Sequence, residues 1–210
     1  MSNWRKKLFA TLNLLALLAL LPMGCDIFCA DSCGCGSGFK NQTLLIKSFE
    51  AITIAADGQQ IQPTSNLPYD QVFKAIRVDD FDLISYEGQD FFEPWSLGTA
   101  YACSPPTPIS ESKLTSLKIT NLREVILGDG TRMQVGEDIT AYFGINDFYS
   151  QGLKPVNQYL QSGKEVYLDG YYKLGFTKDP DAEVSLEFSI SLTMDNGEEF
   201  VLNNQILGIR

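Results

Sequence analysis

Residues 183–194 read Glu-Val-Ser-Leu-Glu-Phe-Ser-Ile-Ser-Leu-Thr-Met, and this stretch decides the fold class. Apolar side chains occupy every second position from Val184 to Met194, and polar side chains lie between them. Because successive side chains of a strand point to opposite faces, this pattern predicts a strand with one buried face. Asp195-Asn196-Gly197 tolerates the positive φ angles of a hairpin turn. Residues 200–209 are therefore predicted as the return strand.

Other parts of the chain also favour strands. Stretches rich in β-branched and aromatic residues, separated by Gly and Pro turn signals, predict further strands over residues 43–56, 74–87, 112–126 and 165–176. Two short helical segments interrupt them. We expect a single turn over 139–143, which Asp138 can cap, and a short helix over 153–161, which ends near Gly163. The predicted fold is mostly β, an antiparallel β-sandwich of the immunoglobulin or a similar type with one or two short helical insertions.

The first 24 residues have the three parts of an export signal. Residues 5–7 are basic, and residues 8–21 are almost wholly apolar. This run is shorter than the roughly 20 residues that a spanning helix needs, and it is typical of a cleaved signal peptide. Pro22 then ends the helix, so the chain can enter a peptidase in an extended form.

The end of this signal carries a family resemblance. Leu21-Pro22-Met23-Gly24-Cys25 resembles the lipobox of bacterial lipoproteins, although Pro22 replaces the usual Leu and Met23 replaces a small residue. The resemblance implies cleavage before Cys25 and lipid on its thiol. An ordinary secretory signal cut near Gly24 is the alternative. The general layout is also similar to uncharacterised β-rich lipoproteins of Bacteroidota, which implies no catalytic residues.

These features define the expected organisation and location. Residues 1–24 are a lipoprotein signal peptide, residues 25–41 a cysteine- and glycine-rich tether, and residues 42–210 a single β-sandwich domain. We expect a lipid-anchored protein of the cell envelope, with the outer membrane favoured over the inner membrane. The lipid on Cys25 is its expected link to the membrane.

The charge of the chain restricts its partners. The 210 residues carry a formal charge of −10, and loss of the three basic residues of the signal leaves 13 basic against 26 acidic residues, or −13. Binding to nucleic acid depends on clustered Lys and Arg at the phosphates. We therefore expect no nucleic acid partner, and the acidic surface is explained by solubility.

Four cysteines remain once Cys25 carries lipid, namely Cys29, Cys33, Cys35 and Cys103. An oxidising compartment favours disulfides between them. A Cys33–Cys35 bridge has one intervening residue and is far from normal disulfide geometry. The other pairings join Cys103 to Cys33 or Cys35, so one bridge would fasten the tether to the domain. Four thiolates around a metal are the alternative, although zinc sites favour wider spacing.

The sequence offers little catalytic chemistry. It contains no histidine, which excludes Ser-His-Asp and Cys-His catalysis, and it has no phosphate-binding loop or dinucleotide fingerprint. Paired carboxylates are the remaining acid–base machinery, and Asp80 and Asp82 could share a strand face. A solvated polar face explains that pair better. We assign no catalytic residue and no cofactor.

Two groups of residues are candidate binding sites. Trp95 lies near Phe91, Phe92 and Tyr101 in an irregular segment, and such rings can stack on a sugar or a partner protein. The rings of Tyr142, Phe143, Phe148 and Tyr149 could equally bind a ligand or fill the core. Three alternating carboxylates, which a calcium ion could use, are Asp179, Asp181 and Glu183.

The leading hypothesis is a non-catalytic envelope lipoprotein that binds or scaffolds a glycan or an envelope protein. A carboxylate-dependent enzyme acting on glycans and a purely structural lipoprotein are the alternatives. Exposed aromatic rings would favour binding, and buried rings would favour a structural role.

Overall fold

The computed structural model describes residues 42–85 and 107–210. Apart from Ser85, these residues belong to one compact unit, Gln42–Ile84 with Thr107–Arg210. The export signal, all the cysteines and the aromatic segment around Trp95 lie outside the described residues. Within them, no helix is long and apolar enough to cross a membrane.

The larger sheet of this unit has six strands. In spatial order they are β3 (Ile109–Ser110), β1 (Gln42–Ala55), β2 (Val72–Ser85), β9 (Tyr172–Phe176), β7 (Phe143–Asp147) and β8 (Lys154–Pro155). β9 pairs antiparallel with β2 and β7, and β7 with β8, whereas β1 and β3 are parallel.

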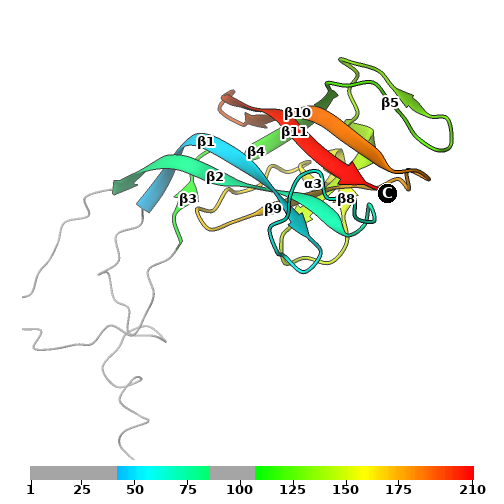
Figure 1. Cartoon of the computed structure of the whole chain (residues 1–210). Helices are drawn as coiled ribbons and strands as arrows, with labels where there is room; N and C mark the ends of the chain where they lie inside the picture. The colour runs from blue at the N-terminus through cyan, green and yellow to red at the C-terminus, as the bar shows by residue number, and fades with distance from the viewer. Residues whose placement is uncertain (1–41, 86–106) are drawn as a thin grey trace, which may run out of the picture. The chain divides into compact units, whose positions relative to one another are not determined.

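The smaller sheet is wholly antiparallel, with β10 (Val184–Met194) between β11 (Glu199–Ile209) and β4 (Leu114–Asn121). Figure 1 shows these three strands side by side. A separate hairpin is formed by β5 (Val125–Ile126) and β6 (Arg132–Met133). Two single helical turns interrupt the strands, η1 (Thr140–Tyr142) and α3 (Val156–Tyr159).

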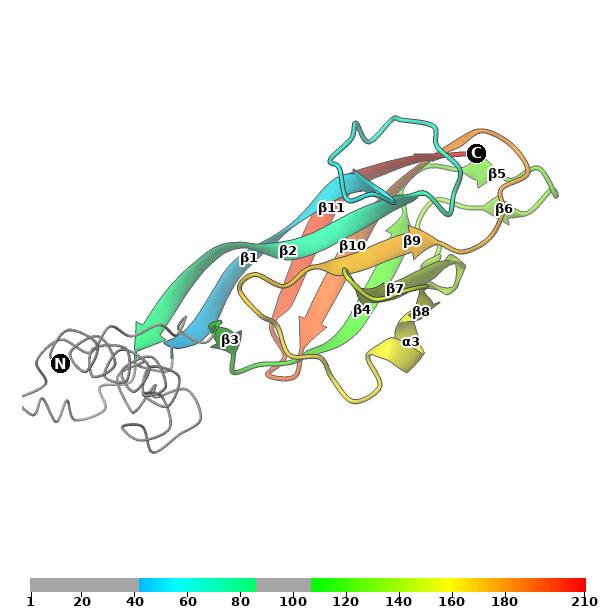
Figure 2. The ribbon, with the colours of Figure 1, turned by 90° about the horizontal axis from the view of Figure 1, so that it is seen from below.

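The two sheets pack face to face around one core. The ring centroids of Phe143 on β7 and Phe188 on β10 are 5.2 Å apart, and those of Phe49 on β1 and Phe200 on β11 are 5.1 Å apart. Figure 2 shows β4, β10 and β11 crossing behind the strands of the larger sheet. The predicted β-sandwich with short helical insertions is confirmed.

The period-two pattern also holds residue by residue. Leu186, Phe188, Ile190 and Leu192 have no exposed surface, whereas the residues between them are partly exposed. Gly197 has a φ of 89° in the turn that joins β10 to β11. This hairpin is therefore built as the sequence predicts.

Three predicted elements are shorter than expected. The strand predicted over 112–126 leaves the sheet at Asn121, because that side chain donates hydrogen bonds to the carbonyls of Met133 and Gln134. The strand predicted over 165–176 begins only at Tyr172, because the residues before it pair with the short β3 segment: Leu168 donates its backbone N–H to the Pro108 carbonyl, and Tyr167 forms an isolated bridge with Ile109.

The predicted helix over 153–161 is a single turn. Pro155 lies at the N-cap of α3, and Gly163, with a φ of 68°, lies just beyond its C-terminal end. The turn predicted over 139–143 is present as η1, and the Asp138 carboxylate accepts a hydrogen bond from the backbone N–H of Thr140 at 3.0 Å.

One charged side chain lies on the core-facing side of β2. Lys74 shares this face with the core residues Val72 and Ile76, two positions away on either side, and only 2% of it is exposed. Its ammonium donates a hydrogen bond to the Thr53 hydroxyl at 2.9 Å. Burial lowers the pKa of Lys74 to about 8, because removal from water disfavours the charged form.

Candidate functional site

A second apolar cluster covers the outer face of the larger sheet. Ile54, Phe73 and Ala75 are buried there, away from the sandwich core. Phe73 and Ala75 occupy the positions of β2 between the core-facing residues, so their side chains point to the opposite side of the sheet. Partly buried residues packed against this cluster are Ile52, Phe148, Leu153 and Tyr171.

A pair of glycines makes room on this face. Gly144 on β7 lies opposite Gly175 on β9. A Cβ atom at Gly175 would lie 2.6 Å from the Phe73 ring and 2.9 Å from Leu153. At Gly144 it would lie 2.8 Å from the Cβ atom of Leu153. The two glycines therefore allow the side chains of Phe73 and Leu153 to lie directly against the backbone of β7 and β9.

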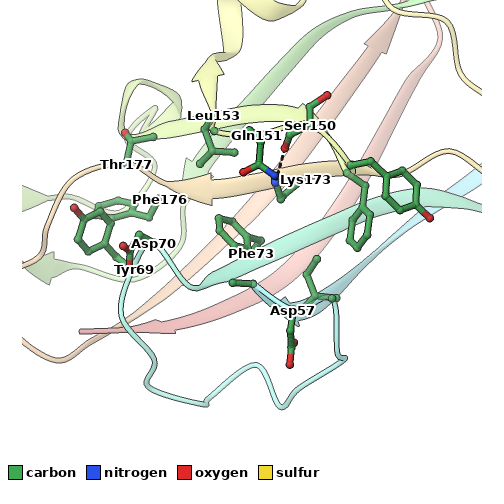
Figure 3. A pocket seen from close by; sticks show the side chains of 16 residues that line it. Asp57, Tyr69, Asp70, Phe73, Ser150, Gln151, Leu153, Lys173, Phe176 and Thr177 are labelled. Atoms are coloured by element: carbon green, nitrogen blue, oxygen red, sulfur yellow. Dashed lines mark hydrogen bonds between the residues drawn. The ribbon is translucent and has the colours of Figure 1, made fainter.

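Above this floor lies a cleft of about 590 Å³, which we call the outer cleft. Figure 3 shows Phe73 among the side chains that line it, which come from four segments within residues 54–58, 69–73, 148–153 and 173–177. Asp57 follows β1, Asp70 precedes β2, and Gln151 comes from the loop after β7. Its volume falls within the roughly 300–1,000 Å³ of ordinary ligand sites, and its lining combines aromatic rings with a few polar groups.

One cation is held in the floor of the outer cleft. The Lys173 ammonium donates a hydrogen bond to the carbonyl of Ser150 at 3.0 Å. It also lies 5.4 Å from the centroid of the Phe73 ring, within the range of a cation–π interaction. These contacts hold the 147–153 loop against the sheet.

The first residues of that loop form what we call the aromatic ridge, Phe148 and Tyr149. Both residues line the outer cleft and also a second cleft beside it. The Phe148 ring packs edge-on against Tyr149, with centroids 5.0 Å apart, and lies 5.7 Å from Tyr171. Tyr149 is 89% exposed, so its ring is displayed to solvent between the two clefts.

The second cleft, which we call the tyrosine cleft, has a volume of about 520 Å³. Its lining includes four tyrosines, Tyr149, Tyr167, Tyr171 and Tyr172, and three carboxylates, Asp147, Glu165 and Asp169. The described residues that line it include no Lys or Arg. The lining therefore offers ring faces and hydrogen-bond acceptors, but no positive charge.

Three of the tyrosines of this cleft are held by hydrogen bonds. The Tyr167 hydroxyl donates to Glu165 at 2.7 Å, which raises the pKa of Tyr167. The Arg77 guanidinium donates to the Tyr171 hydroxyl at 2.8 Å. Tyr172 donates to the backbone carbonyl of Glu165 at 2.8 Å, and burial, together with the nearby Asp147 charge, raises its pKa.

The wall behind the tyrosine cleft is also well ordered by polar contacts. The Asp147 carboxylate accepts a hydrogen bond of 2.5 Å from the hydroxyl of Tyr159, which lies on α3. Burial and this hydrogen bond both raise the pKa of Tyr159, so the phenol stays neutral and remains a donor.

The structure separates the second aromatic group of the sequence into two roles. Phe143 is a core residue, and Tyr142 is partly buried and stacks on Phe176 with centroids 6.1 Å apart. Phe148 and Tyr149 form the aromatic ridge. The other aromatic candidates, Trp95, Phe91, Phe92 and Tyr101, lie outside the described residues.

Sequence reasoning missed the remaining residues of both clefts. Tyr167 and Tyr171 fall within the strand predicted over 165–176, where an aromatic side chain is expected to be buried in the core. The density of aromatic residues in that stretch was the available signal. Asp57 and Asp70 belong to turns, and nothing in their spacing indicates that they share a cleft.

The carboxylate candidates are found on exposed surfaces. Asp80 and Asp82 are exposed, and Asp82 pairs with Lys47 at 2.6 Å, as a solvated polar face requires. Asp179 accepts a hydrogen bond from the backbone of Asp181, and Glu183 accepts one from Asn66. The described part of the chain contains no group of three acidic, His or Cys residues that could hold a metal ion, so the calcium candidates are not gathered into a site.

Comparisons with known proteins do not assign a family. No known family and no curated protein matches the sequence. Among solved structures, a C-terminal domain of the AgI/II polypeptide BspA from Streptococcus agalactiae is similar over 77% of this chain, with 10% identity and a TM-score of 0.27. A second structure of a BspA C-terminal domain has 12% identity and the same TM-score. The matched region spans about half of each of these chains, at 49% and 50%, and so low a score carries no argument about function.

Proposed function

We propose that this chain is a lipid-anchored protein of the cell envelope whose β-sandwich binds an extracellular glycan without cleaving it. The observation that carries this proposal is the aromatic ridge, where a tyrosine that is 89% exposed stands between two clefts with aromatic walls. Most of this ring faces solvent despite its edge contact with Phe148, and tyrosine presents an apolar face together with a polar hydroxyl.

The outer cleft fits the chemistry of a sugar. A sugar ring has apolar C–H faces and hydroxyl groups at its edge. The ridge offers aromatic surface to the faces, while Asp57, Asp70 and Gln151 offer hydrogen-bond acceptors to the hydroxyls. A preformed site of this kind avoids much of the ordering cost of binding.

The placement of the carboxylates supports binding more than catalysis. Asp57 and Asp70 line the same cleft, but both are solvent-exposed. A carboxyl group acting as a general acid in glycoside hydrolysis is typically held in an apolar, desolvated setting that raises its pKa. We therefore assign these two residues to ligand hydrogen bonding.

The anchor is proposed from the sequence. The segment Leu21 to Cys25 supports lipid on Cys25 and therefore an envelope location, for which we favour the outer membrane. Labelling cells with a fatty acid tests this. The wild-type chain should incorporate the label, and Cys25→Ser should leave an unlabelled, uncleaved precursor. Equal labelling of both chains would contradict the anchor.

The binding function is tested with the lipidated full chain in detergent on immobilised oligosaccharides. The panel contains cello-, chito-, xylo-, manno-, glucosamine and galacturonate hexamers. We expect at least one hexamer to bind, and Tyr149→Ala to weaken that binding about tenfold, which corresponds to roughly 1.4 kcal/mol. Val135→Ala, which truncates a 66% exposed apolar residue outside both clefts, is the control and should bind as the wild type does.

Two results would contradict the proposal. If no hexamer binds, the proposed glycan ligand is wrong, and a protein partner would then be sought. Cleavage of a hexamer that is abolished in Asp57→Asn or Asp70→Asn would show that the outer cleft is an active site.

A further inference from the structure

The two clefts are neighbours that share a wall. Phe148 and Tyr149 line both of them, and Tyr171 continues the aromatic surface from the ridge into the tyrosine cleft. Tyr149 is exposed at the boundary, so it can support a ligand that passes from one cleft to the other. A ligand confined to one cleft would leave half of this aromatic surface unused.

Each cleft is large enough to hold a ligand of its own, at about 590 and 520 Å³. Occupying both with one molecule makes the second contact intramolecular, which strengthens binding well beyond that of either part alone. A linear oligosaccharide meets this requirement, because it repeats the same ring along an extended chain. The exposed rings of Tyr149 and Tyr167 then supply surfaces for stacking, whereas the Arg77 guanidinium lies over the Tyr171 ring, 5.5 Å from its centroid.

The chemistry of the tyrosine cleft selects against one class of glycan. Asp147, Glu165 and Asp169 line it, and the described lining residues include no Lys or Arg. A uronic acid or sulfated sugar placed there would bring like charges together and lose water. The cation beside this lining, Arg77, is already paired with Glu50. Neutral hydroxyls can donate to these carboxylates, and an amino sugar would add a cation near the ring faces.

We infer that the outer cleft, the aromatic ridge and the tyrosine cleft form one continuous binding surface for an extended oligosaccharide that lacks acidic sugars. This inference rests on the proposed function and specifies the length and charge of its ligand. The outer cleft holds one end of the oligosaccharide, Tyr149 stacks on the unit that crosses the ridge, and the tyrosine cleft holds the units beyond it.

Chain length provides the first test. The hexamer that binds most tightly in the panel is compared with its dimer on the lipidated full chain. We expect the hexamer to bind at least tenfold more tightly than the dimer, because it alone reaches both clefts. In Tyr167→Ala, the affinity for the hexamer should fall close to the wild-type affinity for the dimer. The affinity of this variant for the dimer should be unchanged, because the dimer occupies the outer cleft.

Charge provides the second test. The double variant Glu165→Gln, Asp169→Asn keeps side-chain size and removes two negative charges from the tyrosine cleft. We expect it to increase binding of the galacturonate hexamer severalfold over the wild type. Glu199→Gln, which removes an exposed charge on β11 outside both clefts, is the matched control and should leave galacturonate binding unchanged.

The outcomes separate this inference from the proposed function. Equal affinity for dimer and hexamer, or an unchanged hexamer affinity in Tyr167→Ala, would overturn the continuous surface while leaving a glycan site in the outer cleft. A galacturonate hexamer as the tightest wild-type ligand would overturn the charge selection. Binding to no oligosaccharide would overturn both proposals.

Discussion

The two faces of the larger sheet are built from the same strands but differ in what covers them: the inner face packs in the core, and the outer face borders the two clefts. On the inner face, side chains of β2 such as Val72 and Ile76 have no exposed surface and pack against the smaller sheet. On the outer face, Phe73 is buried under a loop, and a cleft lies beside it. Among the residues that the structure describes, no second sheet covers this side. An apolar cluster that is covered only in part is therefore where a ligand can complete the packing.

The comparison also extends to charge. The inner face of β2 includes Lys74, whose ammonium is buried and has a lowered pKa, whereas the outer face of β9 includes Lys173, which is held by a carbonyl and a ring at the floor of the outer cleft. The buried ammonium lowers the stability of the fold at neutral pH. The lysine in the cleft stabilises a loop that forms the candidate site.

The largest expected effect on stability comes from a substitution in the core between the two sheets. Phe188→Ala removes a ring that is fully buried between the sheets, so it should lower the free energy of unfolding by about 3–5 kcal/mol. Ser189→Ala, at the next position of β10 on the opposite face, is the control and should change stability by less than about 0.5 kcal/mol. Denaturant titration measures both, and equal losses would mean that the two faces of β10 are not distinct.

The next effect concerns the buried charge. The pKa of Lys74 falls from 10.5 to about 8 on folding, so the unfolded chain binds more protons between these values. The free energy of unfolding should therefore rise with pH through this window, by up to roughly 3 kcal/mol in total. At pH 7 none of this gain is present, because Lys74 is protonated in both the folded and the unfolded chain. Lys74→Met should be more stable than the wild type at pH 7 by about 1–3 kcal/mol, since it replaces a buried ammonium by an apolar chain of similar size.

The stability difference between Lys74→Met and the wild type isolates the contribution of this lysine, because every other titratable group is common to both chains. The difference should shrink as the pH rises from 8 towards 10. A difference that stays constant with pH would contradict a neutral Lys74 above pH 8.

A smaller effect is expected on the outer face. Gly175→Ala places a methyl group 2.6 Å from the Phe73 ring, so it should lower the free energy of unfolding by about 1–3 kcal/mol and narrow the outer cleft. Combining it with Phe73→Leu should cost less than the sum of the two single changes, because the smaller side chain relieves the contact. Strict additivity in denaturant titration would show that the glycine is not there to accommodate Phe73.

The smallest effect on stability belongs to the ridge. Tyr149→Ala removes a side chain that is 89% exposed, so the free energy of unfolding should change by less than about 0.5 kcal/mol while glycan binding falls. Thermal unfolding and binding measured on the same sample test this separation. A large loss of stability would assign Tyr149 to the structure of the loop rather than to the ligand.

The difference between the faces explains what could be predicted from the sequence. The inner face follows from local alternation, so residues 183–194 predict the buried side of β10 correctly. The outer clefts depend on contacts between distant segments. Asp57, Gln151 and Lys173 become neighbours only through the order of strands in the sheet, which no local pattern encodes.

The predicted strand boundaries are wrong where hydrogen bonds from a side chain or a loop replace those between neighbouring strands. Asn121 ends β4 by bonding the carbonyls of Met133 and Gln134, and the sequence around it reads as continuous strand. The tyrosines at 167 and 171 were expected in a strand, but the segment before Tyr172 is a loop that forms a wall of the tyrosine cleft.

Hydrogen exchange of the lipidated full chain, with and without saturating oligosaccharide from the panel, tests the central claim most directly. The account predicts slower exchange in the backbone of residues 56–58, 69–70 and 148–153, which line the outer cleft and include the ridge. Exchange in β4, β10 and β11 should be unchanged, because they lie in the opposite sheet. Protection confined to the opposite sheet, or to the β5–β6 hairpin, would place the ligand elsewhere and contradict the outer face as the binding surface.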